Sequence, residues 1–179
     1  MRELCEWRAG VDEADKDGRT PLYYASKKGR LNVVRELLAR GAYIEAAMNK
    51  GVTSLYVASE CGHLAVVRAL LARGAKIEAA TNGGVTSLLI ASDRGHLNVV
   101  RELLACGANA NAACSDGDTP LIQASYFGHV DVVRALLAAG ANKRHVANNG
   151  NTAASVAGAD AGVKPKAKAA ILALLAATL

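Results

Sequence analysis

The chain has 179 residues, of which 51% are hydrophobic and 21% are charged, and its formal net charge is +5. A chain of this length suggests a single domain. Residues 1–3 lead into no apolar signal segment, and the apolar run over residues 167–179 is too short to span a bilayer. We therefore expect a soluble, cytoplasmic protein that does not enter a membrane, with the nucleus as the alternative compartment.

Four cysteines are scattered along the chain, and they form no Cys-x-x-Cys pair and have no histidine at zinc-ligand spacing. They are Cys5, Cys61, Cys106 and Cys114. Free thiols in a reducing compartment are the interpretation we favour over a metal site. We expect neither a metal nor a cofactor.

A Gly-x-Thr-(Pro/Ser)-Leu motif recurs every 33 residues along the chain. It begins at Gly18, Gly51, Gly84 and Gly117, and a decayed copy begins at Gly150. A fixed period of this length identifies a repeat array. In the second copy, Thr53 can cap a helix that stops at Gly62, because a threonine oxygen accepts the free amides of a first helical turn.

A second helix is predicted in each copy after a Gly-His pair. In the second copy His63 opens this helix, and apolar residues recur from Leu64 to Leu71 at helical spacing. The helix then ends at Gly74, a residue that readily adopts the left-handed conformation. The following segment up to Gly84 contains Asn-Gly and has no helical period, so we predict a turn there.

Units of 33 residues with Thr-Pro-Leu at the head and Gly-His in the middle resemble ankyrin repeats. The resemblance implies an α-helical repeat solenoid of stacked helix-turn-helix units that project short β-hairpin fingers. We expect a single ankyrin-repeat domain over residues 1–179. Its parts are a truncated N-terminal helix or cap (1–14), four full repeats (15–47, 48–80, 81–113 and 114–146) and a C-terminal capping repeat (147–179).

The two ends of the array depart from the pattern. The first finger is shortened, and residues 1–9 resemble the second helix of a truncated leading unit. In the last unit Gly158 and Gly162 loosen the first helix, and the lysine-rich residues 164–168 lead into the apolar residues 171–175. We interpret this segment as a basic cap over the core. A lysine-rich address or a membrane-surface contact is the alternative.

Three histidines, His63, His96 and His129, are also 33 residues apart. Equivalent positions in stacked helices lie about 8–10 Å apart, whereas zinc holds its ligands at roughly 2.1 Å, so these residues do not form one zinc site. The resemblance implies instead that each bonds backbone in the turn before the second helix. His145 lies outside the series, and we expect an exposed finger residue.

Serine follows alanine in each first helix, at Ser26, Ser59, Ser92 and Ser125. We expect small residues here to let neighbouring helices approach, and the serine hydroxyl to bond a carbonyl one turn earlier. The chain contains no phosphate-binding loop, no Gly-x-Ser-x-Gly and no His-Glu-x-x-His motif. We therefore expect a protein that is not an enzyme.

The resemblance implies that a partner protein binds the finger tips and the exposed side of the first helices, which together form a concave surface. The matching positions are Lys16, Asp17, Arg19, Lys27, Lys28, Asn49, Lys50, Val52, Glu60, Cys61, Asn82, Val85, Asp93, Arg94, Ser115, Asp116, Asp118, Tyr126, Phe127, Asn148, Asn149 and Asn151. Among them Tyr126 and Phe127 are the leading candidates for binding hot spots. A pair buried at the end of the groove is the alternative.

One departure from the family affects this surface. The histidine that usually follows Thr-Pro-Leu is replaced in every repeat, by Tyr23, Tyr56, Leu89 and Ile122. These side chains either pack between neighbouring helices or add apolar area to the groove, and we favour packing.

Charge is distributed unevenly over the repeats. Lys and Arg exceed Asp and Glu by three in residues 15–47 and by two in residues 48–80, whereas the next two repeats are neutral. Arginine recurs on the outer face of every second helix, at Arg35, Arg68, Arg101 and Arg134. We interpret these as a solvated face, and not as a nucleic-acid track, because no aromatic residues interleave with them.

The sequence therefore predicts a monomeric, non-catalytic protein-binding module. Its basic N-terminal half would receive an acidic segment of a partner protein, with no nucleic acid involved. The alternative is an engineered or orphan scaffold without a natural ligand. The four scattered cysteines and the incomplete identity of the repeats argue against a designed origin.

Overall fold

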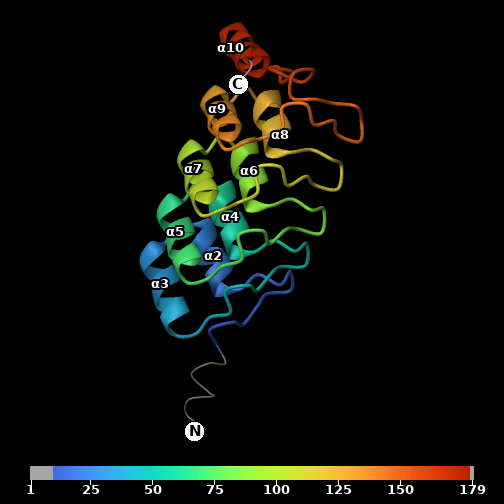
Figure 1. Ribbon diagram of the computed structural model, residues 1–179. Coiled ribbons are helices and arrows are strands. Elements are labelled where there is room, and N and C mark those ends of the chain that lie inside the picture. The colour runs from blue at the N-terminus through green and yellow to red at the C-terminus, as the bar shows by residue number, and fades with distance from the viewer. Residues whose placement is uncertain (1–9, 178–179) are drawn as a thin grey trace.

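The computed structural model describes residues 10–177, which contain nine helices and no sheet. Eight of the helices form antiparallel pairs that stack in two layers, and long loops project from one side (Figure 1). The first helices of the pairs are α2 (Pro21–Lys27), α4 (Ser54–Glu60), α6 (Ser87–Asp93) and α8 (Pro120–Tyr126). The second helices are α3 (Leu31–Ala39), α5 (Leu64–Ala72), α7 (Leu97–Ala105) and α9 (Val130–Ala138), and α10 (Pro165–Ala176) follows. The predicted helical repeat array is confirmed.

Threonine begins each first helix, as the sequence predicts. The Thr53 hydroxyl accepts the amide of Tyr56 at 3.2 Å, and Thr20, Thr86 and Thr119 make the equivalent bond. Helix α4 ends one residue before its cap, Cys61, and the chain then turns at Gly62 with a φ of 74°. A side chain is strained in this left-handed conformation, so glycine is needed to reverse the chain into α5.

The second helix of each pair buries one face and exposes the other. In α5, Val66, Val67 and Leu70 are buried, whereas Ala65 and Arg68 are exposed. The periodicity of the sequence predicts this division, because residues three and four apart share a face of a helix. The same pattern in every pair builds one continuous core between the two layers.

Small residues allow the first helices to lie close to one another. The alanine at this position is fully buried in three repeats, and its neighbouring serine is fully buried in all four. Ser59 and Ser92 donate to the carbonyls of Leu55 and Leu88 at 2.8 Å, which confirms the expected bond in two repeats. In the other two repeats the expectation is wrong, because the buried hydroxyls of Ser26 and Ser125 have no hydrogen-bond partner within residues 10–177.

The projecting loops are the expected fingers, and their strand content is small. Single antiparallel bridges join Ala47 to Thr53 and Ala80 to Thr86, and residues 10–177 contain no longer ladder. Consecutive fingers are linked to one another instead. The amide of Asn82, for example, donates to the carbonyl of Lys50 at 3.0 Å. Each finger is therefore held by its neighbours.

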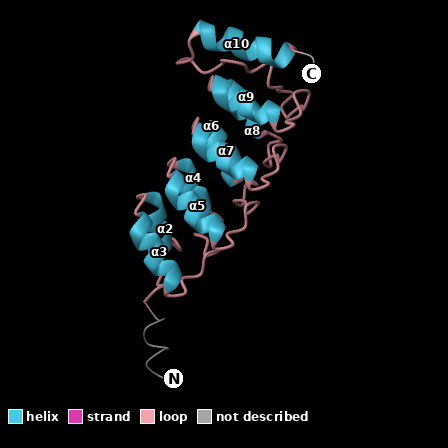
Figure 2. Cartoon of the chain, turned by 60° about the vertical axis from the view of Figure 1, so that its left-hand side comes forward, coloured by secondary structure: helices cyan, strands magenta, loops and turns pink. Residues whose placement is uncertain are grey.

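The C-terminal end of the stack is closed by α10, which lies across α9 (Figure 2). Ile171 and Leu175 are buried, so this segment covers the core as predicted. The expected first helix of the last unit is absent, because residues 153–158 form only turns. Thr152 and Ser155 bond each other's backbone amides at 2.9 and 3.1 Å, the reciprocal pattern of a helix N-terminus, but the turns end at Gly158, whose φ of 63° is left-handed.

The predicted helix over residues 1–9 lies outside the described residues. Within residues 10–177, no helix is both long and apolar enough to cross a membrane. Each finger runs from the end of a second helix to the start of the next first helix, so the glycine turns lie at the opposite end of each helix pair from the fingers (Figure 2).

Candidate functional site

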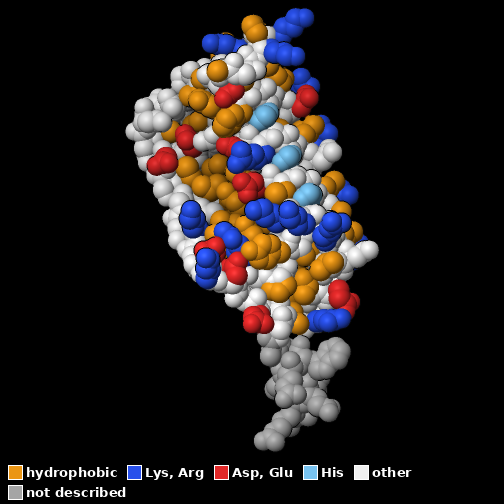
Figure 3. All heavy atoms as spheres, turned by 180° about the vertical axis from the view of Figure 1, so that it is seen from behind, with side chains coloured by type: hydrophobic (Ala, Val, Ile, Leu, Met, Phe, Trp, Pro, Cys, Tyr) orange, Lys and Arg blue, Asp and Glu red, His pale blue; other side chains and the backbone are white. Residues whose placement is uncertain are grey.

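The finger tips and the exposed positions at the C-terminal ends of the four first helices, one helix length away from the fingers, form what we call the finger-side surface. Each helix contributes a pair of residues at equivalent positions, namely Lys27 and Lys28, Glu60 and Cys61, Asp93 and Arg94, and Tyr126 and Phe127. The chemistry of the pair changes at every step along the stack. Figure 3 shows this face, on which basic side chains gather beside a band of hydrophobic ones.

The N-terminal end of the finger-side surface carries uncompensated positive charge. Lys27 and Lys28 are exposed, and neither side chain has an ion-pair partner within residues 10–177. Arg19 in the nearby finger differs from them, because its guanidinium lies 3.0 Å from the carboxylate of Asp17. The two lysines are therefore unpaired among the described residues, as is Lys16 in the first finger.

In the middle of the finger-side surface, the charged side chains form ion pairs with one another. Arg94 contacts Glu60 of the preceding repeat at 3.2 Å and its neighbour Asp93 at 3.4 Å. Burial raises the pKa of Asp93, although the charge of Arg94 acts in the opposite direction. Burial, followed by the charge of Glu60, also raises the pKa of the Cys61 thiol. A protonated thiol is a poor nucleophile, so this cysteine has no sign of catalytic activation.

An aromatic pair occupies the C-terminal end. The rings of Tyr126 and Phe127 meet edge to face with centroids 4.9 Å apart, and Phe127 stacks on His129 at 6.2 Å. Tyr126 is 38% exposed, whereas Phe127 is half-buried. The alternative of a buried pair is therefore wrong for Tyr126. Phe127 thus has an aromatic ring on each side, which restricts its motion, so contact with a partner would order this ring little further.

The residues that replace the usual histidine pack between the helices, as we favoured. Tyr23, Leu89 and Ile122 are buried, and Tyr56 is half-buried. Burial raises the pKa of Tyr56 to about 12 and also raises the pKa of Tyr23. Both phenols thus remain neutral at physiological pH and add no charge to the helices beneath the finger-side surface.

The asparagines of the fingers have a structural role that the sequence did not reveal. The side-chain amides of Asn49, Asn82 and Asn148 donate to carbonyls of the preceding finger at 3.3, 3.3 and 2.9 Å. In the last finger, Asn149 accepts the amide of Asn151 at 2.9 Å. These side chains are committed to the stack, and a partner would meet their remaining oxygen or nitrogen atoms only.

The other finger positions differ in accessibility. Lys16, Lys50, Ser115 and Asp116 are exposed, whereas Val52, Val85 and Asp118 are half-buried. Burial, followed by the charge of Asp116, raises the pKa of Asp118. One carboxylate oxygen of Asp118 accepts the amide of Gln123 at 2.9 Å, and the other is buried without a partner among the described residues.

The histidines join neighbouring repeats. The Nε2 atoms of His63, His96 and His129 lie 3.1, 2.9 and 2.7 Å from the carbonyls of Lys27, Glu60 and Asp93. The expected backbone bond is confirmed, but its partner is the first helix of the preceding repeat and not the adjacent turn. Each bond therefore fixes the helix end that carries one pair of the finger-side surface.

His145 corrects the sequence prediction. It is half-buried, and its Nε2 lies 2.8 Å from the carbonyl of Gly117 in the preceding finger. The spacing of 28 residues differs from the repeat period, so this contact could not be predicted from the repeat pattern. Among residues 10–177, no group of three or more His, Cys, Asp or Glu side chains could hold a metal ion.

The fold is a helical repeat array that presents a continuous surface built from equivalent positions. A family model described as ankyrin repeats (3 copies) matches residues 1–81 and 77–146. The chain therefore belongs to the ankyrin-repeat family, whose repeats are generally protein-protein interaction modules. No curated protein matches the chain.

Proposed function

We propose that this protein is a non-catalytic module that binds an extended segment of a partner protein along the finger-side surface. The observation that carries the proposal is the change of chemistry from one end of the surface to the other. Lys27 and Lys28 are free cations, Glu60 and Arg94 neutralise each other, and Tyr126 is an exposed aromatic. A complementary segment is acidic at one end and apolar at the other.

The length of the stack sets the length of this segment. Neighbouring packed helices are about 8–10 Å apart, so the three steps from α2 to α8 span about 24–30 Å. An extended chain advances about 3.3–3.6 Å per residue, so a segment of about seven to nine residues reaches from the lysines to the aromatic pair. The neutral middle would receive uncharged residues.

The two ends are expected to act differently in binding. Exposed charges mainly steer the encounter, and salt screens them, whereas a fixed and partly desolvated aromatic ring retains the bound partner. Lys27 and Lys28 would therefore govern the association rate. Tyr126 and Phe127 would govern the dissociation rate.

A displayed library of random nine-residue peptides tests the proposal without a known partner. Selected peptides should combine acidic residues at one end with Leu, Phe or Tyr at the other. In surface plasmon resonance, Tyr126→Ala and Phe127→Ala should each weaken binding by roughly 1 kcal/mol or more, chiefly through dissociation. Reversal of Lys27 and Lys28 to Glu should slow association, and less so at high salt.

Arg101→Glu is the matched control, because Arg101 is an exposed cation on a second helix, away from the finger-side surface. It should change neither rate. If Arg101→Glu abolished binding while Tyr126→Ala and Phe127→Ala had no effect, the partner would bind the opposite side and the proposal would be wrong. Selection of no peptide would instead favour a scaffold without a ligand.

A further inference from the structure

The second helices alternate in sequence along the face opposite the finger-side surface. Helices α3 and α7 both read LNVVRELLA, whereas α5 reads LAVVRALLA and α9 reads VDVVRALLA. The position after the shared arginine is therefore Glu36, Ala69, Glu102 and Ala135 in turn. A carboxylate is present in every other repeat only.

This alternation decides which arginine finds a partner in the next repeat. The guanidinium of Arg68 on α5 contacts Glu102 on α7 through two nitrogens, each 2.8 Å from the same oxygen. Arg35 on α3 is the equivalent arginine one repeat earlier, but the position it meets on α5 is Ala69. Arg35 has no ion-pair or hydrogen-bond partner for its guanidinium within residues 10–177.

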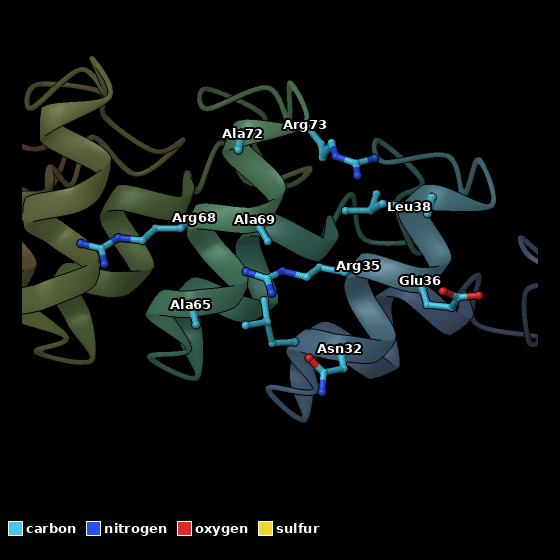
Figure 4. A pocket seen from close by; sticks show the side chains of 11 residues that line it. Asn32, Arg35, Glu36, Leu38, Ala65, Arg68, Ala69, Ala72 and Arg73 are labelled. Carbon is cyan, nitrogen blue, oxygen red and sulfur yellow. The ribbon is translucent and has the colours of Figure 1, made fainter.

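A groove of about 700 Å³ lies between α3 and α5, where this ion pair is missing. Small side chains line it on the α5 side, namely Ala65, Ala69 and Ala72. Arg35 points across the groove from α3, and Arg73 points toward α3 from the far end of α5 (Figure 4).

The other charged side chains that line the groove are already paired. The carboxylate of Glu36 is held by Arg40 at 2.7 Å, and Figure 4 shows Glu36 directed away from the gap. Arg68 is directed toward α7, where it contacts Glu102. Two guanidinium groups therefore line an alanine-lined groove that contains no free carboxylate among the described residues, that of Arg35 near Ala69 and that of Arg73 at the far end (Figure 4).

The equivalent groove between α7 and α9 provides an internal comparison. It has a volume of about 510 Å³, and Arg101 occupies the place of Arg35. However, Asp131 replaces Ala65 and contacts Arg134 at 3.3 Å, and Ala139 replaces Arg73. Shape is thus shared between the two grooves, but the α3/α5 groove has two unpaired guanidinium groups within residues 10–177, those of Arg35 and Arg73, whereas the α7/α9 groove has one, that of Arg101.

We propose that the α3/α5 groove binds a helix of a partner protein that carries a carboxylate among small apolar residues. The carboxylate would lie over Ala69 and contact Arg35, as Glu102 contacts Arg68. A helix fits because alanine side chains allow close approach of a third helix, whose residues pack into the groove as ridges. This site lies on the opposite side from the finger-side surface, so it does not depend on the function proposed above.

The probe for this site is an 18-residue helical peptide of alanine, leucine and glutamate, with its glutamates along one stripe. A counterpart with glutamine in place of glutamate is the control for charge. Titration into the full ¹⁵N-labelled chain should shift amide signals of α3 and α5 in a saturable manner, at lower peptide concentration than any shift of α7 and α9, because the α3/α5 groove has one more unpaired arginine. The glutamine peptide should bind about fivefold or more weakly, because the arginine contact loses its charge.

Matched variants separate the groove from general electrostatics. Ala69→Glu supplies the missing carboxylate from within the chain and should weaken peptide binding at least about fivefold, whereas Ala135→Glu in the other groove should not. Both variants should fold, because glutamate already occupies this position in α3 and α7. Arg35→Ala and Arg73→Ala should each weaken binding by about threefold or more.

Three results would overturn the proposal. Equal binding of the glutamate and glutamine peptides would remove the role of the arginines. If Ala69→Glu and Ala135→Glu weakened peptide binding equally, the effect would be a nonspecific effect of charge. If a single-stranded DNA oligonucleotide shifted the same amides at lower concentration than the peptide, the site would favour a nucleic acid and not a helix.

Discussion

The contact between Gly62 and His96 should make this glycine more sensitive to substitution than a glycine such as Gly74, beside which an added Cβ would meet nothing within 4 Å. Gly62 has a φ of 74°, and a Cβ built on it would lie 2.7 Å from Nδ1 of His96. The imidazole cannot move freely, because its Nε2 is 2.9 Å from the carbonyl of Glu60. Gly62→Ala therefore combines backbone strain with the loss of a bond between repeats.

The expected loss follows from these two terms. A non-glycine residue in the left-handed conformation costs about 1–2 kcal/mol, and a lost hydrogen bond costs about 0.5–1.5 kcal/mol. Gly62→Ala should therefore lower the free energy of unfolding by about 1.5–3.5 kcal/mol. Gly74 is the matched control, because its φ is 84° and an added Cβ would meet nothing within 4 Å. Gly74→Ala should lower the free energy of unfolding only by the cost of the left-handed backbone conformation, about 1–2 kcal/mol.

Urea denaturation followed by circular dichroism measures both losses, and a double mutant isolates the contact. In a His96→Ala background the clash is absent, so Gly62→Ala should lower the free energy of unfolding by no more than Gly74→Ala does. The coupling energy between positions 62 and 96 should be about 0.5–1.5 kcal/mol. Equal losses for the two single glycine variants, or a coupling below about 0.3 kcal/mol, would refute the role of the histidine contact.

Leu70→Ala should lower the free energy of unfolding by about 2–5 kcal/mol, because Leu70 is 0% exposed; a loss below about 0.5 kcal/mol in urea denaturation would contradict this. Asp118 has a raised pKa, chiefly through burial, so its contribution to stability is present below its unfolded pKa and is lost as pH rises through the folded pKa. Asp118→Asn should therefore reduce the fall of Tm as pH rises above about 4, the ordinary pKa of an aspartate, and an unchanged profile would contradict the burial argument. EDTA should leave Tm unchanged, given the lack of a metal-ligand cluster in residues 10–177, and a drop of several degrees would reveal a missed site.

The helices could be predicted from the sequence because their boundaries depend on local chemistry. Thr53 bonds an amide three residues away, and Gly62 turns the chain through its own φ angle. Neither effect needs knowledge of the neighbouring repeats. The apolar spacing from Leu64 to Leu71 likewise depends only on the helical period.

Contacts between repeats were harder to predict, because their offsets differ from the period. His63 reaches Lys27, 36 residues earlier, and His145 reaches Gly117, 28 residues earlier. The period of 33 identifies equivalent residues, but it does not say which atom of the preceding repeat each one meets. Similarly, the alternation of Glu36 and Ala69 is visible in the sequence, whereas the groove it leaves depends on how α3 and α5 lie.

The same distinction between periodic and variable positions supports the assignment of the binding surface. Positions that repeat without change, such as Thr53 and Gly62, are occupied by residues that the stack itself requires. The last residue of the first helix is Lys27 in one repeat and Tyr126 in another. The stack does not require a particular residue at this position, because its side chain projects from the end of the helix. Exchange of these two residues should therefore leave the free energy of unfolding nearly unchanged while it reverses the end at which an acidic peptide binds. A large loss of stability would show that the variation serves packing, and the finger-side surface would lose its main support.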